Sequence, residues 1–470
     1  MKHTFAYTIV AALVAAGAGV AQVPETVTSM IERNAEMGLE RYPIGFWNYT
    51  NLAAHGQYMD EAEIEEWADA GFTLTMTPNF DASNWRQVEH MRRILDWAHA
   101  RGMKLILCDP RTYSPHQSVG MGREAIPDSH REGIANAVKT FGDHPGLFGF
   151  HIGDEPGVEA NEAFFAAYRA TKRAAPNLHP FMNFLPWYPG VSERVGYDTW
   201  PEYLDAAVAK ADLDFLCWDC YAQMNPGLSG WDMYYKNLRL YREAAWRHGI
   251  PFWNTVLSVG HFNYRCPSFN DLRWQFNTTV ASGASGVLWF FYYMREPHSN
   301  YRLSPVDEHW DRTETYYDLR RIQKSFHRQY GDLFLRLAPV RVTFAPEAFG
   351  DGDVFTPNEV VSAIDSGGKP VLIGEFAGSA GQRYVMVVNN STEENARVAV
   401  TFPGKDVQLH SWQWNGTEQP GHAYSADSAE RTEAGVTVWH WLAPGQEAVY
   451  RVESELTRST PVTIQAEKGE

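Results

Sequence analysis

The sequence predicts an α/β fold class, a (β/α)8 TIM barrel followed by a C-terminal all-β sandwich domain, and two observations lead to this prediction. Eight short apolar runs recur between residues 44 and 293, and each precedes a segment of helical period. After about residue 339 the helical period disappears, and short alternating runs separated by Gly, Asn and Asp follow. The alternative, a doubly wound open sheet, would usually carry a Gly-rich phosphate loop after an early strand, and none is visible.

Residues 1–21 are typical of a secretory signal peptide. Lys2 precedes an apolar run from Phe5 to Val20, and small residues around Ala21 suit a cleavage site. No later stretch is apolar enough for a membrane-spanning helix. The mature protein is therefore expected to be secreted or periplasmic, without a membrane span.

Eight strand-then-helix units are expected within the barrel, residues 22–338, after a short helix over residues 29–39. The expected strands are 44–48, 72–79, 103–109, 147–154, 180–185, 213–221, 251–259 and 286–293. The expected helices are 60–70, 84–100, 131–141, 160–174, 201–209, 231–248, 270–281 and 315–337. Gly71, Gly102 and Gly249 stand where three of these helices end, as glycine commonly does at a helix C-terminus.

Residues 339–455 are expected to form the β-sandwich domain. Its expected strands are 340–344, 371–376, 384–388, 396–402, 436–441 and 445–452. The polar residues 456–470 are expected to be a disordered tail. Two roles remain open for this domain, namely carbohydrate binding or cover for one flank of the barrel.

Composition argues against several kinds of partner. A formal net charge of −17 disfavours nucleic acid, because phosphate contacts need clustered Lys and Arg. Four cysteines in 470 residues make no disulfide framework, and no Cys/His cluster has zinc spacing. The sequence therefore predicts no cofactor and no metal site, and it says nothing of the oligomeric state.

The most informative stretch is residues 147–157, where a short apolar run ends in Asp154 and Glu155, followed by Pro156. Two like charges side by side at the end of a buried strand cost desolvation and repulsion. Such repulsion separates the two pKa values, so that one carboxyl stays protonated near neutral pH while the other is ionised. The hydrolysis of an acetal needs that pairing of an acid with a base.

Functional residues in barrels of this type cluster at the C-terminal ends of the strands. There the sequence places carboxylates, amides and aromatic rings, which hydrogen-bond sugar hydroxyls and stack on sugar faces. A carbohydrate site is therefore expected. Its candidate residues are Asn48, Asn79, Asp109, Arg111, Asp154, Glu155, Asn183, Trp187, Trp218, Asp219, Tyr221, His261, Trp289 and Tyr293.

The run Gly153-Asp154-Glu155-Pro156 resembles the Asn-Glu-Pro signature of the large clan of retaining barrel glycoside hydrolases. The resemblance implies that Glu155 is the general acid/base. This chain departs from the pattern in two ways. Asp154 replaces the Asn, and the seventh expected strand offers only Asn254, Ser258 and His261 where the clan has a second Glu.

The run from His151 to Glu155 also resembles the His-x-Gly-Gly-Asp-Glu run of barrel β-hexosaminidases, one Gly shorter, and a related Asp-Glu-Pro run occurs in a family of β-N-acetylgalactosaminidases. This resemblance implies that Glu155 protonates the leaving oxygen while Asp154 orients the substrate's own acetamido group as nucleophile. Asp219, at the end of the sixth strand, is the remaining candidate for a nucleophile or a base.

The sequence thus predicts a secreted glycoside hydrolase that cleaves O-glycosidic bonds of oligo- or polysaccharides. Glu155 is the expected general acid, with Asp154 or Asp219 as partner carboxylate. One alternative is a substrate-assisted N-acetylhexosaminidase, and another is a non-catalytic glycan-binding barrel protein. A metal-dependent hydrolase is a further rival, although the first strand lacks a His-x-His pair; its ligands would be Asp109, His151, Asp154, Asp219 and His261.

Overall fold

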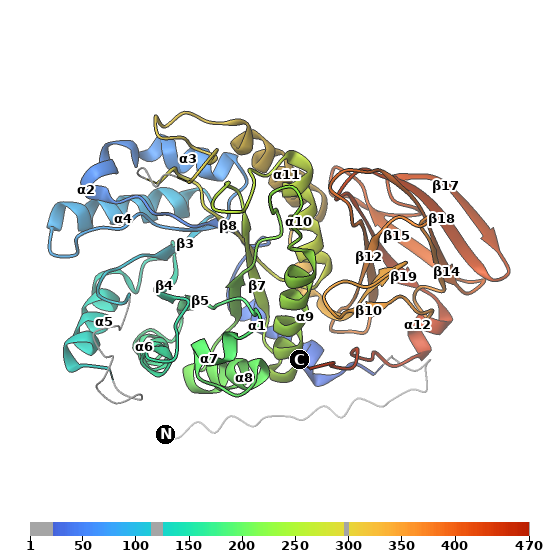
Figure 1. The fold of residues 1–470 in the computed structure, drawn as a ribbon, viewed down its shortest axis with the longest axis horizontal. Coiled ribbons are helices and arrows are strands. Elements are labelled where there is room, and N and C mark those ends of the chain that lie inside the picture. Colours follow the sequence, from blue (N-terminus) through green and yellow to red (C-terminus); the bar gives the residue numbers. More distant parts are fainter. Residues whose placement is uncertain (1–21, 114–125, 296–299, 470) are drawn as a thin grey trace, which may run out of the picture.

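A computed structural model of the chain describes residues 22–113, 126–295 and 300–469. The predicted signal peptide, residues 1–21, lies outside this range. Within it, no helix combines the length and the apolar character needed to cross a membrane. The chain divides into an N-terminal α/β part and a C-terminal β part, which lie side by side (Figure 1).

Eight short parallel strands form the centre of the N-terminal part. They are β1 (Ile44–Phe46), β2 (Leu74–Met76), β3 (Lys104–Leu107), β4 (Leu147–Asp154), β5 (Phe181–Asn183), β6 (Leu216–Asp219), β7 (Phe252–Leu257) and β8 (Val287–Phe290). They pair in the orders β1-β8-β7-β6 and β2-β3-β4-β5. The two sheets meet at two places. Thr73 N, just before β2, donates to Ile44 O of β1, and Phe184, just after β5, forms a parallel bridge to Trp218 of β6.

Helices follow the strands in the predicted alternation. They are α1 (Glu25–Glu36), α2 (Leu52–His55), α3 (Glu61–Asp69), α4 (Trp85–Ala100), α5 (Asp128–Phe141), α6 (Asn161–Ala174), α7 (Val191–Val195), α8 (Trp200–Ala211), α9 (Trp231–His248), α10 (Phe269–Ala281) and α11 (Glu314–Tyr330). Local sequence sets several ends, since capping boxes begin α8 and α10. Helix α11 ends at Tyr330, earlier than predicted, because the glycine that follows, Gly331, adopts a positive φ of 58°.

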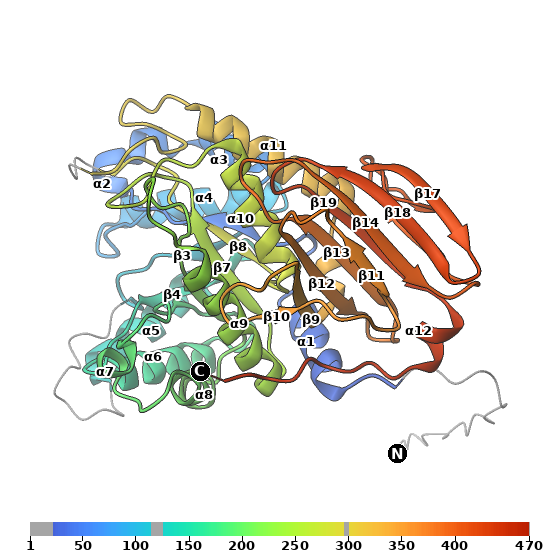
Figure 2. The same ribbon diagram turned by 45° about the vertical axis from the view of Figure 1, so that its right-hand side comes forward.

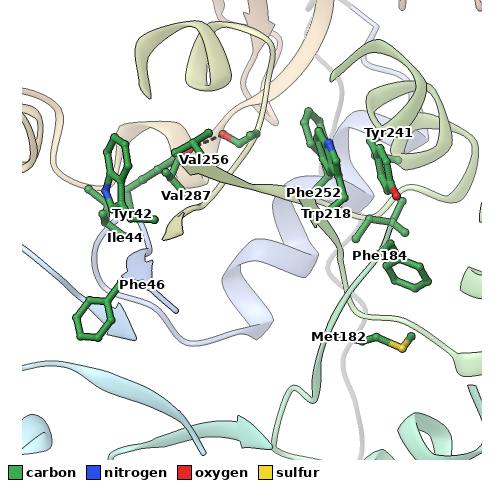
Figure 3. Packing of buried hydrophobic residues seen from close by; sticks show 14 of the residues in the cluster. Tyr42, Ile44, Phe46, Met182, Phe184, Trp218, Tyr241, Phe252, Val256 and Val287 are labelled. Atoms are coloured by element: carbon green, nitrogen blue, oxygen red, sulfur yellow. Dashed lines mark hydrogen bonds between the residues drawn. The ribbon is translucent and has the colours of Figure 1, made fainter. Parts of the chain in front are cut away.

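Alternate residues of the buried strands enter two different cores. One cluster draws on residues in or next to all eight strands, including Cys217, Trp253 and Leu288. Their neighbours in sequence, such as Trp218 and Trp289, belong to the core between strands and helices. Figure 3 shows Trp218 beside Tyr241 of α9 in that second core. This alternation decides which strand residues can reach a central site.

The C-terminal part consists of two further sheets. Its strands are β9 (Ala338–Ala345), β10 (Asp353–Val354), β11 (Ala363–Asp365), β12 (Val371–Ala377), β13 (Arg383–Asn389), β14 (Ala396–Pro403), β15 (Gln408–Trp412), β16 (Glu418–Pro420), β17 (Ala426–Thr432), β18 (Gly435–Leu442) and β19 (Glu447–Glu453). The sheet orders are β10-β9-β12-β13-β19-β15-β16 and β11-β14-β18-β17, with antiparallel pairing except between β9 and β10. Apolar residues of both sheets share one core.

The two parts are joined through α9, α10 and α11, which lie between the parallel strands and the β part (Figure 1). Buried indole groups make specific contacts across this boundary. Trp246 Nε1 of α9 donates to Pro339 O, and Trp274 Nε1 of α10 donates to Asn390 Oδ1. Satisfied polar contacts within an apolar interface fix how the two parts sit on each other.

The prediction of a disordered tail over residues 456–470 is wrong. Residues Glu455–Ser459 form a short helix, α12, and the chain then runs back along α1 to the N-terminal part (Figure 2). Val462 N donates to Gln22 O, and Gln465 bonds β9 through both its backbone and its side chain. These backbone bonds order a segment whose polar composition alone gives no sign of it.

Candidate active site

A cavity of about 350 Å³ lies at the C-terminal ends of the parallel strands. Six of the predicted site residues line it together, from β4, β5, β6 and the loops that follow β6 and β7. They are Asp154, Glu155, Asn183, Asp219, Tyr221 and His261. Residues from distant parts of the sequence therefore converge on one cavity, as expected of a site at the strand ends.

The end of β4 delivers two consecutive carboxyl groups to this cavity. Gly153 allows the close approach of α6, because a Cβ there would lie 1.7 Å from the ring of Phe164. Glu155 then adopts a positive φ of 43°, which is uncommon for a residue other than glycine. Its backbone N–H donates to Asn183 O over 2.9 Å, so the turn is tied to the end of β5.

One amide group connects the carboxylates of two strands. Asn183 Nδ2 donates to Asp154 Oδ1 over 3.1 Å and to Asp219 Oδ1 over 2.6 Å. The two acceptor oxygens are therefore at most about 5.7 Å apart, which is the sum of the two bond lengths. Asn183 is almost fully buried, so its side chain cannot turn freely toward solvent.

Burial raises the pKa of all three acids, and repulsion by neighbouring carboxylates adds to the rise for Asp154 and Glu155. Burial, then Asp219, then Asp154, raises the pKa of Glu155 to about 8. Burial and Asp219 raise the pKa of Asp154 to about 7, against the hydrogen bond from Asn183. Burial raises the pKa of Asp219 to about 6, and hydrogen bonds from Asn183 and Tyr221 oppose the rise. Near neutral pH, Glu155 is thus the protonated member and Asp219 the ionised one.

Arg194 of the short helix α7 is a cation beside these carboxyls. Its Nη2 lies 3.5 Å from Glu155 Oε2, and its side chain is half exposed. Arg194 lowers the pKa of Glu155, but burial and the two aspartates have larger effects. Sequence reasoning missed this residue, because it follows no strand directly.

Two of the predicted tryptophans are core residues rather than site residues. Trp218 is fully buried and stacks on Tyr241 with ring centroids 4.0 Å apart (Figure 3). Trp289 is also fully buried and stacks on Phe276 of α10. Both point toward the helices, so their prediction as substrate contacts is wrong. Phe290, the next residue on β8, lines the cavity instead.

Three other predicted contacts are engaged elsewhere. Tyr293 is buried and its hydroxyl donates to Glu63 Oε1, away from the cavity. Asn48 is buried and accepts hydrogen bonds from the backbone and hydroxyl of Thr50, so it stabilises a turn. Asn79 donates to the backbone of the same turn. The predictions for Tyr293 and Asn48 are corrected by these contacts, whereas Asn79 is exposed outside the cavity lining, so its role as a substrate contact stays a prediction.

Asp109 and Arg111 stabilise each other. Asp109 is fully buried, and the Arg111 guanidinium donates to both of its oxygens over 2.9 and 2.7 Å. Trp187 lies outside the cavity, with Lys236 Nζ 3.7 Å from its ring centroid. These residue types at strand ends serve local structure, and the predictions of substrate contact are not supported for them.

Several aromatic residues that sequence reasoning missed complete the cavity. They are Trp47, Tyr49, Phe262, Tyr264 and Phe290. Trp47 and Tyr49 flank Asn48 directly after β1, so the alternation of a strand was a signal that could have selected them. Phe262 is 58% exposed at the cavity and also has a positive φ, 46°. No pattern in the sequence marks it.

Among the residues that the structure describes, no group of three His, Cys, Asp or Glu side chains is arranged to hold a metal ion. His151 is buried, its Nε2 donates to Gly153 O over 3.2 Å, and burial lowers its pKa to about 3. It is therefore a core residue. The cavity thus offers acids, an amide and aromatic rings, which can transfer protons and bind hydroxyl groups.

No protein-family model matches the sequence, and no curated protein matches it. Solved structures do match the fold of this chain. A glycoside hydrolase family 5 protein from Bacteroides vulgatus is 13% identical at a TM-score of 0.52, with 90% of this chain and 92% of that chain covered. The β-galactosidase from Bacillus circulans sp. alkalophilus is 9% identical at 0.53, with 86% and 99% covered.

The β-galactosidase from Marinomonas ef1 is 12% identical at a TM-score of 0.47, and the match spans 60% of this chain and 59% of that one. The chain thus spans less than two thirds of that protein. The family 5 protein and the Bacillus circulans β-galactosidase have TM-scores above 0.5, and their likeness to this chain is a statement about fold. The chain has the mixed α/β fold of these glycoside hydrolases, with antiparallel sheets at its C-terminal end.

Proposed function

We propose that the chain is a glycoside hydrolase that cleaves O-glycosidic bonds of oligo- or polysaccharides. The observation that carries the proposal is the group of three carboxyls, Asp154, Glu155 and Asp219, at one cavity at the ends of parallel strands. Their pKa values are spread by burial and repulsion, so an acid and a base coexist near neutral pH. The shared fold with glycoside hydrolases supports it.

In this proposal Glu155 is the general acid. Its proton passes to the glycosidic oxygen as the bond from that oxygen to the anomeric carbon breaks. Asp219, ionised near neutral pH, is the partner carboxylate, acting as nucleophile or as base for a water molecule. Water supplies the hydroxyl group at the anomeric carbon. If Asp219 is the nucleophile, the proton of that water returns to Glu155; if Asp219 is the base, it takes that proton and releases it to solvent, and Glu155 regains a proton from solvent. Asn183 holds Asp219 in place.

A specific observation favours a second candidate, the substrate-assisted N-acetylhexosaminidase. β7 ends at Leu257, and the Ser258 hydroxyl that follows donates to Phe291 O, so the described end of this strand presents no carboxylate. Asp154, next to Glu155 in the chain, would then orient an acetamido group of the substrate. In that case Asp154 is the partner of Glu155, and Asp219 supports it through Asn183.

The architecture around the site completes the proposal. The eight strands, joined at β1–β2 and β5–β6, are proposed to close as a (β/α)8 barrel over residues 22–338. Residues 339–455 are proposed to be a β-sandwich, because both sheets share one core. Residues 1–21 are proposed to be a signal peptide that directs export.

The experiment is hydrolysis of a panel of nitrophenyl glycosides, N-acetylhexosaminides included, by wild type and Glu155→Gln. Cleavage of one glycoside by the wild type and its loss in the variant support the proposal. Cleavage restricted to N-acetylated sugars selects Asp154 as the helper. Retained glycan binding without turnover on glycosides or natural polysaccharides selects the non-catalytic binding protein. Activity that EDTA abolishes selects a metal-dependent hydrolase.

A further inference from the structure

A second cavity lies beside the candidate active site, where loops of the α/β part face the β part. Its volume is about 600 Å³, compared with about 350 Å³ for the candidate active site. One wall is formed by residues of the loop between β6 and α9, within 222–231, and the opposite wall by the turn at 391–394 between β13 and β14. Volumes of this order are typical of ligand sites.

The two cavities share one thin wall. It is made of two paired segments, since Met224 forms an antiparallel bridge with Tyr264, and Arg265 N donates to Gln223 O over 2.8 Å. Tyr221 and Tyr264 line the candidate active site, whereas Met224 and Arg265 line the second cavity. A saccharide chain that leaves the first cavity across these paired segments reaches the second cavity.

The lining of the second cavity suits a saccharide. Asn225, Ser229 and Thr392 bring an amide and two hydroxyl groups from both parts of the chain. Trp231, at the start of α9, stacks on Trp274 with ring centroids 4.7 Å apart and remains partly exposed to the cavity. Amide, hydroxyl and indole groups are suited to hydroxyl-rich ligands with apolar faces.

The charges favour a neutral ligand. Arg265 is bound by both oxygens of buried Asp271 over 2.5 and 2.6 Å, so its charge is matched within the protein. The opposite wall carries Glu393 and Glu394, and Glu394 pairs with Lys369. The described lining thus has no surplus of positive charge to attract a uronic or sulfated sugar.

We infer that this cavity is an accessory glycan-binding subsite, which holds a neutral stretch of the same saccharide whose bond lies in the candidate active site. The inference rests on the proposed function for its substrate class. It assigns the β part a role in substrate binding through the turn at residues 391–394, in addition to its packing on the helices. Long saccharides gain contacts there that short ones cannot reach.

The test fills the cavity from each wall with Ser229→Trp and Thr392→Trp. The control is Ser379→Trp in the turn between β12 and β13, because the pairing of Val371 with Asn389 puts that turn at the opposite end of the hairpin from the cavity. For each variant, kcat/KM is measured for a neutral hexasaccharide of the sugar that the wild type cleaves, and for the nitrophenyl glycoside of that sugar. The ratio of the two values is expected to fall about tenfold in both cavity variants, and to stay within twofold in the control. An unchanged ratio in the cavity variants overturns the inference.

A second measurement separates this inference from the proposed function. Affinity electrophoresis in gels containing a neutral β-glucan, a galactan or a xyloglucan compares wild type, Glu155→Gln and Thr392→Trp. Retardation by one glycan that persists in Glu155→Gln and is lost in Thr392→Trp supports the subsite, even if no turnover is found. Equal retardation of wild type and Thr392→Trp, or no retardation by any of these glycans, overturns it.

Discussion

Asp154 and Asp219, which end strands β4 and β6, accept hydrogen bonds from the same nitrogen atom, Asn183 Nδ2 on β5. The arrangement holds two buried carboxyls close together and places a third, Glu155, next to them in the chain. Groups that interact this strongly titrate as a unit. Several measurable properties follow from this relationship.

The first is the pH dependence of activity. Because burial raises the pKa of Glu155 to about 8 and that of Asp219 to about 6, the acid is protonated and its partner ionised between these values. We expect kcat/KM to follow a bell with limbs near pH 6 and pH 8. Glu155→Gln should lose about 10²–10⁴-fold in kcat, whereas the exposed neighbour variant Glu159→Gln should lose little. Equal losses in the two variants would contradict the assignment.

The second prediction concerns Asn183. Asn183→Ala removes the donor shared by Asp154 and Asp219, and that donor lowers the pKa of both carboxyls. Their pKa values should rise, so the acidic limb of the pH–rate profile should move to higher pH, with kcat lowered about tenfold or more. Tyr264→Phe, which alters the same cavity without removing this donor, serves as control. An acidic limb that stays in place in Asn183→Ala would show that Asn183 has a purely structural role.

The third prediction is that the contribution of Asp154 to the stability of the protein falls as the pH rises. The folded pKa of Asp154, about 7, is above its ordinary value, so the folded state retains a proton that the unfolded state has released. Stability from this group is complete below the ordinary pKa near 4 and is lost as the pH passes through 7. Asp154→Asn should therefore raise the free energy of unfolding by about 2–3 kcal/mol more at pH 9 than at pH 5. Urea denaturation at the two pH values measures this, with exposed Glu430→Gln as control. A gain of equal size at both pH values would count against it.

The sequence and the structure agree best where a pattern has one reading. The strand-and-helix alternation and the end of β4 at Asp154 could be predicted because apolar runs, helix caps and strand-end polar residues are local signals. The predictions for Trp218 and Trp289 failed because a strand buried on both faces shows no polar alternation, so its inward residues cannot be selected. The prediction for Tyr293 failed for another reason. The partner of its hydroxyl, Glu63, is distant in the chain, and no local sequence pattern indicates such a contact.

The fourth prediction uses this difference in facing. Trp218→Ala should lower the free energy of unfolding by about 3–5 kcal/mol, because it empties a packed position beside Tyr241. Phe290→Ala removes a ring that lines the cavity. Compared with Trp218→Ala, it should therefore lower kcat/KM more and the free energy of unfolding less. Thermal unfolding and kinetics of both variants at a temperature where both are folded make the comparison. A larger kinetic defect in Trp218→Ala would restore it as a substrate contact.

The fifth prediction concerns the C-terminal segment. Gln465 Oε1 accepts from Val342 N over 2.8 Å, so Gln465→Ala leaves a backbone group of β9 without its partner. The cost should be about 1–2 kcal/mol of stability. Thr463→Ala, at an exposed neighbouring position, is the control, and chemical denaturation is the measurement. Indistinguishable midpoints for the two variants would mean that the segment adds no stability.

The hydrogen bond between Val462 N and Gln22 O places the segment that follows α12 beside the first described residue. A short linker between two such neighbouring segments lets new ends be opened elsewhere in the chain without crossing the fold. New ends opened in the exposed turn between β12 and β13 would keep every strand of the carboxyl cluster uncut. Strands β4, β5 and β6 would then leave the ribosome after β13 to β19 rather than before them, while the geometry around Asn183 would stay the same. Such a permutant tests whether the geometry of the site depends on the order of synthesis or on the final structure alone.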